Sequence, residues 1–319
     1  MVIASIVFFG IMQIPEKGTN KSIITESNFS TLQNDFFSQD FNNNTKKIFI
    51  LGTSEIQALN TTKINSKVQI QCPECMVYNL SRQGESINKR IKTVDSIISA
   101  NPHLIIYGIS EIDFRTLTNA EYKNPKTILP DIGDIIHNEI KPFKYFEFLK
   151  IPQSPKDQTW NLIRQLNKDG SLYSSFTPYP NTPFLTIEKT HTIIISELEL
   201  AQTLVDYNSN EEINDPVKNQ SLKNMKEIIN KVQKNNHKIV LFITPHHDYL
   251  TSKQSIKFKE SFQMILSDLE NSTDVKIYPR SESYSRLPIW HDTNHIAVND
   301  KSSIYSEDIS KIIIEELKP

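Results

Sequence analysis

Short apolar runs rich in β-branched residues restrict the fold of this chain more than any other feature. They show little alternation of polar and apolar residues, and they cover residues 47–51, 76–80, 103–109, 238–244 and, more weakly, 275–279. A strand that is apolar throughout is buried on both faces, which is typical of a parallel sheet covered by helices. The runs therefore predict the strands of a buried parallel sheet.

Segments with helical periodicity lie between these runs. Apolar residues recur along one helical face in residues 85–101 and again in residues 216–236, and residues 255–271 and 302–318 show further helical patterns. Strands and helices that alternate in this way predict an α/β fold. We expect a three-layer α/β/α sandwich with a mostly parallel central sheet and right-handed crossovers.

Residues 115–215 interrupt the alternation. The segment is rich in proline, and aromatic residues are interleaved with the prolines in residues 141–152 and 171–184. A loop of that length without structure of its own is uncommon in a compact domain. We expect a long insertion that forms a lid or subdomain over the carboxyl edge of the sheet. The alternative is a packing appendage with no role in binding.

The chain begins with an apolar segment, residues 1–15. It is shorter than the roughly 20 residues of a full membrane span, and it predicts a membrane anchor or a signal-like segment. Residues 16–45 are polar and rich in Asn, Ser and Thr, as a linker would be. We therefore expect one folded domain, residues 46–319, anchored to a membrane on its extracytoplasmic face or secreted. The alternative is that residues 1–15 form part of the core.

The charge balance excludes one class of partner. The chain has 35 basic and 37 acidic residues, and its formal net charge is -2. No arginine-rich stripe or basic arm stands out in the sequence, although a nucleic-acid-binding surface normally shows one. We therefore expect no nucleic-acid partner.

The two cysteines, Cys72 and Cys75, lie just before the apolar run of residues 76–80. A zinc site would need further ligands of similar spacing, and a redox motif normally opens a helix after a strand. We expect the pair to form a local disulfide in an oxidising compartment. Two inert thiols are the alternative.

Polar residues follow the apolar runs, at the places where the predicted strands end. In an open parallel sheet, ligands bind beyond the carboxyl ends of the strands. The residues delivered there are Ser54 after the first run, Arg82 and Gly84 after the second, Ser110, Glu111 and Asp113 after the third, His246 and His247 after the fourth, and Asp292 and His295 before the last helix.

These residues resemble the blocks of the SGNH, or GDSL-like, hydrolase superfamily. The family's first block is Gly-Asp-Ser, and this chain has Gly-Thr-Ser at residues 52–54. The second block places a glycine after the second strand, which Gly84 matches, and the last block is Asp-X-X-His, which residues 292–295 match. The third block is Gly-X-Asn-Asp, and residues 108–111 read Gly-Ile-Ser-Glu. The matches run in order and cover most of the chain outside the insertion.

The resemblance implies a set of catalytic roles. Ser54 would be the nucleophile, His295 the general base and Asp292 the group that orients the imidazole. The backbone N–H groups of Ser54 and Gly84, with the hydroxyl of Ser110, would form the oxyanion hole. Ser110 replaces the family's Asn with a shorter donor, and losing one such donor costs about a hundred- to a thousandfold in turnover. Alternatively, Ser54 and Asp292 are helix caps and Gly84 is a turn glycine.

Other polar residues at these strand ends are candidate substrate contacts. Arg82, His246 and His247 are the strongest of them, and Glu55 and Asp113 are either contacts for a carbohydrate or members of ion pairs. Adjacent residues of a strand point to opposite faces, so one of the two histidines should face the cleft. The sequence shows no converging set of metal ligands around them, and we expect neither a metal nor another cofactor.

The apolar start, the polar linker and the sequence "FITPHH" make the chain most similar to the membrane-anchored, cell-envelope branch of the superfamily. That branch includes the teichoic-acid D-alanylation protein and the alginate O-acetylation proteins, and its flavodoxin-like architecture agrees with the predicted sandwich. The resemblance implies an extracytoplasmic serine esterase or O-acyltransferase that acts on an acylated envelope glycan or surface polymer. The alternative is an inactive scaffold that binds glycan or a membrane acyltransferase partner.

Overall fold

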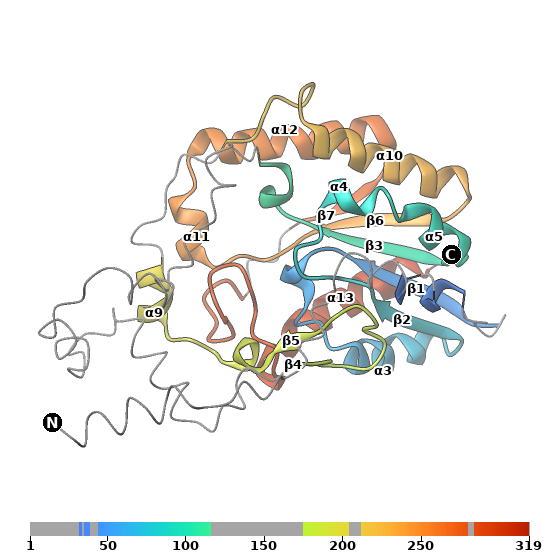
Figure 1. The fold of residues 1–319 in the computed structure, drawn as a ribbon, viewed down its shortest axis with the longest axis horizontal. Helices are drawn as coiled ribbons and strands as arrows, with labels where there is room; N and C mark the ends of the chain where they lie inside the picture. The colour runs from blue at the N-terminus through green and yellow to red at the C-terminus, as the bar shows by residue number, and fades with distance from the viewer. Residues whose placement is uncertain are drawn as a thin grey trace, which may run out of the picture.

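The computed structural model describes residues 32–33, 35–38, 44–115, 175–203, 212–279 and 284–318. Its centre is a sheet of five strands in the spatial order β2-β1-β3-β6-β7 (Figure 1). All four neighbouring pairs are parallel. The strands are β1 (Lys46–Leu51), β2 (Cys75–Asn79), β3 (Leu104–Ile109), β6 (Lys238–Ile243) and β7 (Lys276–Tyr278). Each overlaps one of the predicted runs, so the predicted parallel sheet is confirmed.

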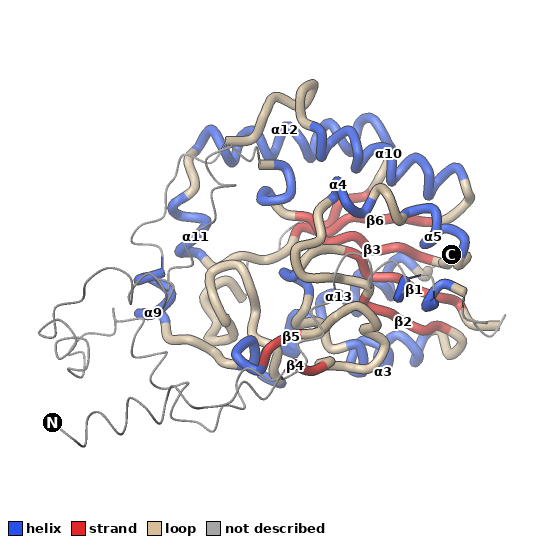
Figure 2. The backbone as a smooth tube through the Cα atoms, in the orientation of Figure 1, coloured by secondary structure: helices blue, strands red, loops and turns tan. Residues whose placement is uncertain are grey.

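Helices cover both faces of this sheet (Figure 2). One face carries α4 (Ile87–Arg90), α5 (Val94–Ser99), α10 (Gln220–Lys234) and α12 (Ile256–Thr273). The other face carries α3 (Thr61–Gln71) and α13 (Ser303–Glu316). A further short helix, α11 (Asp248–Lys253), follows β6. The predicted three-layer α/β/α sandwich is therefore confirmed, with the predicted helix of residues 85–101 divided into α4 and α5.

The alternation of side chains along β1 shows how one strand serves two cores. Phe49 and Leu51 belong to the hydrophobic cluster under α10 and α12, and Ile48 and Ile50 belong to the cluster under α3 and α13. All four are fully buried. Burying a side chain of this size stabilises a fold by about 1.5–3 kcal/mol, which explains why these four positions are apolar.

Helix α3 was not predicted from the sequence, because its residues are largely polar. Its first turn is capped by Asn60, whose side chain accepts the backbone N–H of Lys63 at 3.1 Å. Asn65 lies buried against β2, where its amide accepts from the backbone N–H of Val77 at 2.8 Å and donates to the carbonyl of Val77 at 3.2 Å. Hydrogen bonds to a neighbouring strand therefore hold α3 in place, and the spacing of apolar residues in the sequence carries no sign of such bonds.

Cys72 and Cys75 form a disulfide at the turn that joins α3 to β2. Both side chains are buried in the cluster under α3 and α13. The backbone N–H of Cys75 also donates to the carbonyl of Cys72 at 2.9 Å, so covalent and hydrogen bonds close the same short turn.

The predicted anchor, residues 1–15, lies outside the described residues, as does most of the predicted linker. Within the linker, Phe36 is buried, and its ring packs near those of Phe49, Tyr78 and Phe184 at centroid distances of 6.5, 5.7 and 5.5 Å. Among the described helices, none combines the length and apolar character that a bilayer span needs. The proposed domain boundaries stay predictions.

Much of the predicted insertion, residues 116–174 and 204–211, also lies outside the described residues. The described part contains the short antiparallel strands β4 (Ser175–Phe176) and β5 (Ile187–Glu188), the 3₁₀ helix η4 (Lys189–Thr192) and α9 (Glu197–Thr203). It packs beside the loop before α13, because Ile195 N–H donates to the Trp290 carbonyl at 2.9 Å and Val298 N–H to the His191 carbonyl at 2.8 Å. Its role as a lid stays a prediction.

Two glycines allow the turn after β1 to lie directly on β3. A Cβ atom on Gly108 would lie 2.7 Å from the ring of Phe242 and 3.0 Å from a methyl carbon of Ile56. A Cβ atom on Gly52 would lie 3.1 Å from the Gly108 carbonyl oxygen, and Gly52 has a φ of 153°, which other residues rarely adopt. Larger residues at these positions would displace the turn that carries Ser54.

We expect Gly108→Ala to lower the free energy of unfolding by about 1–3 kcal/mol, because the added methyl group overpacks a filled site. Urea denaturation measures the effect. The same substitution in a Phe242→Leu background is the control, since leucine lacks the ring atoms that the methyl group meets. An equal loss in both backgrounds would contradict the contact with Phe242.

Candidate active site

Ser54 begins the 3₁₀ helix η1 (Ser54–Ile56), which starts three residues after β1 ends. Thr53 caps this helix, and its hydroxyl accepts the backbone N–H of Glu55 at 3.3 Å. Gly52 supplies the left-handed backbone conformation that turns the chain out of the strand. The side chain of Ser54 is partly exposed at the carboxyl edge of the sheet, where a ligand can reach it.

The loop of residues 290–296 presents His295. The carboxylate of Asp292 accepts the backbone N–H groups of Asn294 and His295, both at 2.7 Å, which closes a tight turn. An isolated bridge between Trp290 and Ile296 closes the base of the loop. The Asp-X-X-His spacing thus brings the carboxylate back onto the imidazole of its own turn.

Ser54, His295 and Asp292 form one continuous chain of hydrogen bonds. Ser54 Oγ lies 2.9 Å from His295 Nε2, and His295 Nδ1 lies 2.8 Å from Asp292 Oδ2. Because the carboxylate can only accept, Nδ1 carries the proton and Nε2 is left to accept the hydroxyl proton of Ser54. The structure therefore brings together the three residues that the sequence pattern predicted, in the tautomer that a serine nucleophile requires.

The electrostatics of this pair favour a charged imidazole. Burial by itself would lower the pKa of His295, but the hydrogen bond and the negative charge of Asp292 raise that pKa above its ordinary value, with a further contribution from Glu55. Burial would raise the pKa of Asp292, whereas the hydrogen bond and charge of His295 hold it at about 2. Asp292 therefore stays ionised and stabilises the imidazolium that forms when Ser54 loses its proton.

Two of the three predicted oxyanion donors remain available. Gly84 is exposed in the turn after β2 with a φ of 67°, and open space lies where a Cβ atom would be. In the described part of the chain, no acceptor receives the backbone N–H of Ser54 or of Gly84. Donors left without a protein partner at a strand edge are suited to a ligand oxygen.

The third predicted donor, Ser110, differs from expectation. Its side chain is buried, and its hydroxyl donates to Glu55 Oε1 at 3.1 Å and lies 3.4 Å from Asp113 Oδ2. A serine hydroxyl has one proton, and here that proton is directed to a carboxylate beneath the turn. The prediction that Ser110 donates into the oxyanion hole is therefore corrected: the shorter side chain does not replace the family's Asn.

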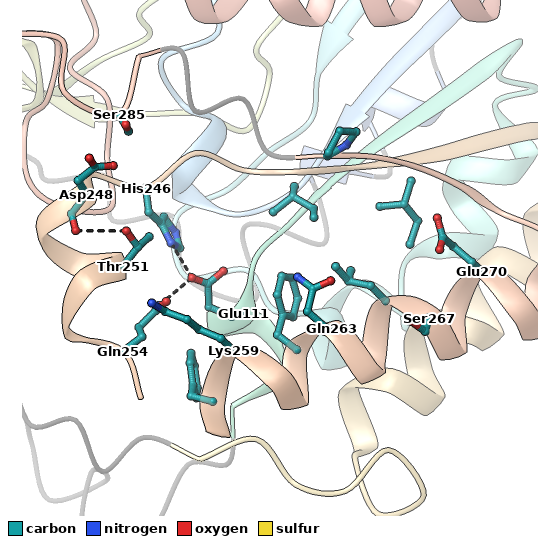
Figure 3. Close-up of a pocket in the computed structure, with 16 residues that line it drawn as sticks. Glu111, His246, Asp248, Thr251, Gln254, Lys259, Gln263, Ser267, Glu270 and Ser285 are labelled. Atoms are coloured by element: carbon teal, nitrogen blue, oxygen red, sulfur yellow. Dashed lines mark hydrogen bonds and ion pairs between the residues drawn. The ribbon is translucent and has the colours of Figure 1, made fainter. Parts of the chain in front are cut away.

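Glu55 and Glu111 hold a buried imidazole between them. His246 Nε2 lies 3.1 Å from Glu55 Oε1, and His246 Nδ1 lies 3.1 Å from Glu111 Oε1, which also accepts from Gln254 at 2.7 Å (Figure 3). The His246 side chain has no exposed surface. Burial would lower its pKa, but the charges of Glu111 and Glu55 raise it to about 9. Both ring nitrogens of His246 thus bind buried carboxylates, and its role as a substrate contact stays a prediction.

His247 is also engaged within the protein. Its side chain is 1% exposed, Nδ1 accepts the backbone N–H of Tyr249 at 3.1 Å, and Nε2 lies 3.2 Å from Glu197 Oε1. It caps α11 and joins that helix to Glu197 of α9, and its role as a substrate contact stays a prediction. Arg82 is largely buried and lies 3.9 Å from Glu85, which leaves its role as a substrate contact a prediction.

Asp113 lies beside this buried group and is itself half-buried. Its carboxylate accepts the backbone N–H of Ser110 at 2.8 Å and caps the 3₁₀ helix η2 (Glu111–Phe114). Loss of hydration, followed by the negative charge of Glu55, raises the pKa of Asp113 to about 8. Asp113 is therefore protonated at neutral pH, and its role as a carbohydrate contact stays a prediction.

The sequence did not single out a pair of histidines beside the triad. The rings of His191 and His291 lie 4.9 Å apart, and their Nδ1 atoms lie 3.3 and 3.2 Å from the backbone carbonyls of Glu188 and Ile193. Burial lowers the pKa of both, so both are neutral at pH 7. They are far apart in the chain, and no spacing rule joins them.

A cavity of about 590 Å³ lies on the α12 side of the buried carboxylates (Figure 3). Glu111, His246 and Gln254 border one end of it, as Figure 3 shows, and Phe258 and Phe262 of α12 also line it. No triad residue lines it, so it is distinct from the Ser54 site. Within the residues that the structure describes, no group of three His, Cys, Asp or Glu side chains is arranged to hold a metal ion.

A parallel α/β/α sheet that carries a hydrogen-bonded Ser-His-Asp chain at its carboxyl edge has the arrangement of a serine hydrolase site. Among 12 matching chains of known structure, an acetyl xylan esterase, AlAXEase, is 11% identical with a TM-score of 0.42, over 85% of this chain and 100% of that chain. The esterase EstA from Pseudoalteromonas sp. is 10% identical with a TM-score of 0.42, over 85% and 98%. TesA is 9% identical with a TM-score of 0.42, over 86% and 99%.

No protein-family model and no curated protein sequence matches the chain. With identities near a tenth and TM-scores below 0.5, the chemistry of this chain has to be argued from its own residues. The distances among Ser54, His295 and Asp292 carry that argument.

We expect the imidazole of His295 to titrate above 6.5, its ordinary value, because Asp292 stabilises the charged form. Asp292→Asn keeps the shape of the side chain but removes its charge, so the titration should move to lower pH. NMR of the ring carbons and nitrogens, assigned with His295→Gln, measures both values. A titration of His295 that Asp292→Asn leaves in place would contradict the pairing.

Proposed function

We propose that this protein is a serine esterase or O-acyltransferase of the SGNH type, which acts outside the cytoplasm on an acylated envelope glycan or surface polymer. One observation carries the catalytic part of the proposal: the hydrogen-bonded chain from Ser54 through His295 to Asp292. These distances place a hydroxyl, an imidazole and a carboxylate in the geometry of a nucleophile, its base and the group that orients the base.

Acylation follows from this geometry. Ser54 Oγ attacks the carbonyl carbon of an ester while His295 Nε2 takes the hydroxyl proton, and Asp292 stabilises the imidazolium. The carbonyl oxygen becomes an oxyanion, for which the N–H groups of Ser54 and Gly84 are the donors. When the tetrahedral intermediate collapses, the ester oxygen leaves with the proton from His295, and the acyl group stays on Ser54.

The second half of the cycle decides between hydrolysis and transfer. His295 removes a proton from water or from a substrate hydroxyl, and the oxygen of that group attacks the acyl-Ser54 carbonyl. The bond to Ser54 Oγ then breaks, His295 returns the proton to Ser54, and the acyl group leaves as a free acid or as a new ester. Both outcomes use the same residues. The choice depends on whether the acceptor site excludes water.

Three sequence features support the substrate class and location. They are the apolar residues 1–15, the polar linker of residues 16–45 and the resemblance to the cell-envelope branch of the SGNH superfamily. The disulfide of Cys72 and Cys75 supports an oxidising compartment. Neutral imidazoles of His191 and His291 beside the triad are suited to hydrogen bonds with hydroxyl groups of a glycan.

A second candidate is a scaffold that binds glycan or a membrane acyltransferase without catalysis. The position of Ser110 favours it, because the hydroxyl that replaces the family's Asn donates to Glu55 instead of into the oxyanion hole. A missing donor lowers turnover by about a hundred- to a thousandfold, which is large but leaves a working acyl-enzyme pathway. An intact triad therefore favours the enzyme.

We expect Ser54→Ala and His295→Ala each to lower hydrolysis of p-nitrophenyl acetate by several orders of magnitude, and the double variant by little more, because the pair acts as a unit. Asp292→Asn should lower it less. Labelling by a fluorophosphonate, run in parallel, detects a reactive Ser54 even if the acyl-enzyme is not hydrolysed by water.

Ser99→Ala is the matched control, since Ser99 is exposed on α5 and its hydroxyl bonds only its own helix. It should keep both labelling and turnover. If the wild-type protein shows neither labelling nor turnover, the scaffold replaces the enzyme as the proposed function.

The pH dependence of labelling should follow the titration of His295. Only neutral His295 can accept the proton of Ser54, so the rate rises with pH and levels off once the imidazole is neutral. Because Asp292 raises the pKa of His295, the midpoint should lie above pH 6.5 and agree with the midpoint measured by NMR. A flat profile between pH 5 and 9 would argue against a histidine base.

A further inference from the structure

Glu55, the residue after Ser54, points into the protein, and its hydrogen bonds hold the turn that carries Ser54. Glu55 is 6% exposed, and its Oε1 accepts from Ser110 at 3.1 Å, while its Oε2 accepts from Thr244. Ser110 follows β3, and Thr244 follows β6. One carboxylate therefore joins the Ser54 turn to the ends of β3 and β6, the next two strands on that side of β1.

Glu55 is ionised and forms an ion pair. Burial by itself would raise its pKa, but the charge of His246 and the hydrogen bonds of His246 and Thr244 bring the pKa below its ordinary value. His246 is held 3.1 Å from Glu55 and is protonated at neutral pH, because Glu111 binds its other nitrogen. Burying a charge pair costs desolvation energy that offsets much of its attraction, so a contribution to stability does not by itself explain why Glu55 and His246 lie next to Ser54.

The charges of Glu55 and His246 also affect the pKa of His295. The negative charge of Glu55 raises the pKa of His295, and the positive charge of His246 lowers it by less. The other groups that face His295 are Asp292 from its own loop and the neutral rings of His291 and His191. Glu55 in turn faces Asp113 from η2, which is protonated, and Tyr305 from α13.

We propose that Glu55, in its ion pair with His246, is a positioning residue for acyl transfer: it anchors the Ser54 turn across the ends of β3 and β6 and favours the imidazolium of His295. This inference rests on the proposed function for its catalytic half. Its electrostatic half concerns the charge on His295 and holds independently of turnover. The inference also assigns a role to Ser110, because its hydroxyl donates to Glu55 and helps to fix that carboxylate.

Glu55→Gln tests both halves, because glutamine keeps the size of the side chain and removes its charge. We expect the NMR titration of His295 to move to lower pH. Fluorophosphonate labelling of Ser54 should slow by about ten- to a hundredfold, as expected when a nucleophile loses its fixed geometry. The KM for p-nitrophenyl acetate should change little while kcat falls, since Glu55 lies beneath the turn and touches no substrate.

Glu316→Gln is the matched control. Glu316 is a buried carboxylate that pairs with Lys238, the first residue of β6, at the end of the sheet opposite to Ser54. It should lower thermal stability but leave the titration of His295 and the labelling rate near those of the wild type. A change in His295 as large as that of Glu55→Gln would overturn the proposal, because loss of packing would then explain both.

Glu55→Gln leaves His246 with one carboxylate partner, so folding is checked by circular dichroism. If that variant does not fold, the double variant Glu55→Gln, His246→Gln removes both charges and keeps hydrogen-bonding groups in place. It should move the titration of His295 in the same direction by a smaller amount.

An unchanged His295 titration together with an unchanged labelling rate, in whichever of these variants folds, would overturn the proposal. The two failures are distinguishable. If wild-type protein neither labels nor hydrolyses esters, the proposed function fails, while the titration still decides whether Glu55 sets the charge on His295.

Discussion

A buried carboxylate, Glu55, lies where the carboxyl ends of three adjacent strands meet. Its oxygens accept from Ser110, Thr244 and His246, which come from the ends of β3 and β6. A buried charge without such partners would cost several kcal/mol, so the position of each donor is restricted by the others. The Ser54 turn, which begins one residue before Glu55, is held at the edge of the sheet as a result.

The triad depends on this anchor from one side and on a tight loop from the other. Ser54 reaches His295 only because the loop of residues 290–296 folds back on itself through Asp292 and rests on the segment that follows β6, where His247 N–H donates to the Thr293 carbonyl at 3.0 Å. The hydrogen-bonded chain of Ser54, His295 and Asp292 therefore joins parts of the protein that are more than 200 residues apart in sequence. Its geometry is a property of the sheet order, not of any single segment.

The exchange of roles at Ser110 has a chemical consequence. In the SGNH pattern that the sequence resembles, an Asn at this place donates to the oxyanion, whereas here the Ser110 hydroxyl donates to Glu55. The backbone N–H groups of Ser54 and Gly84 are the candidate donors that remain. Such a site stabilises the tetrahedral intermediate less than a three-donor hole would.

The strands, the four amphipathic helices and the residues of the triad could be predicted from the sequence alone. Continuous β-branched runs are buried on both faces, and Asp-X-X-His is a local turn, so neighbouring residues carry the information. Helix α3, the buried position of His246 and the new partner of Ser110 could not be predicted in this way. Each depends on hydrogen bonds between residues far apart in the chain, such as Asn65 with Val77 and His246 with Glu55. The tertiary structure decided the rest: because β1 packs between β2 and β3, the side chain of Ser54 lies at the exposed edge of the sheet, whereas that of Glu55 is buried under the turn.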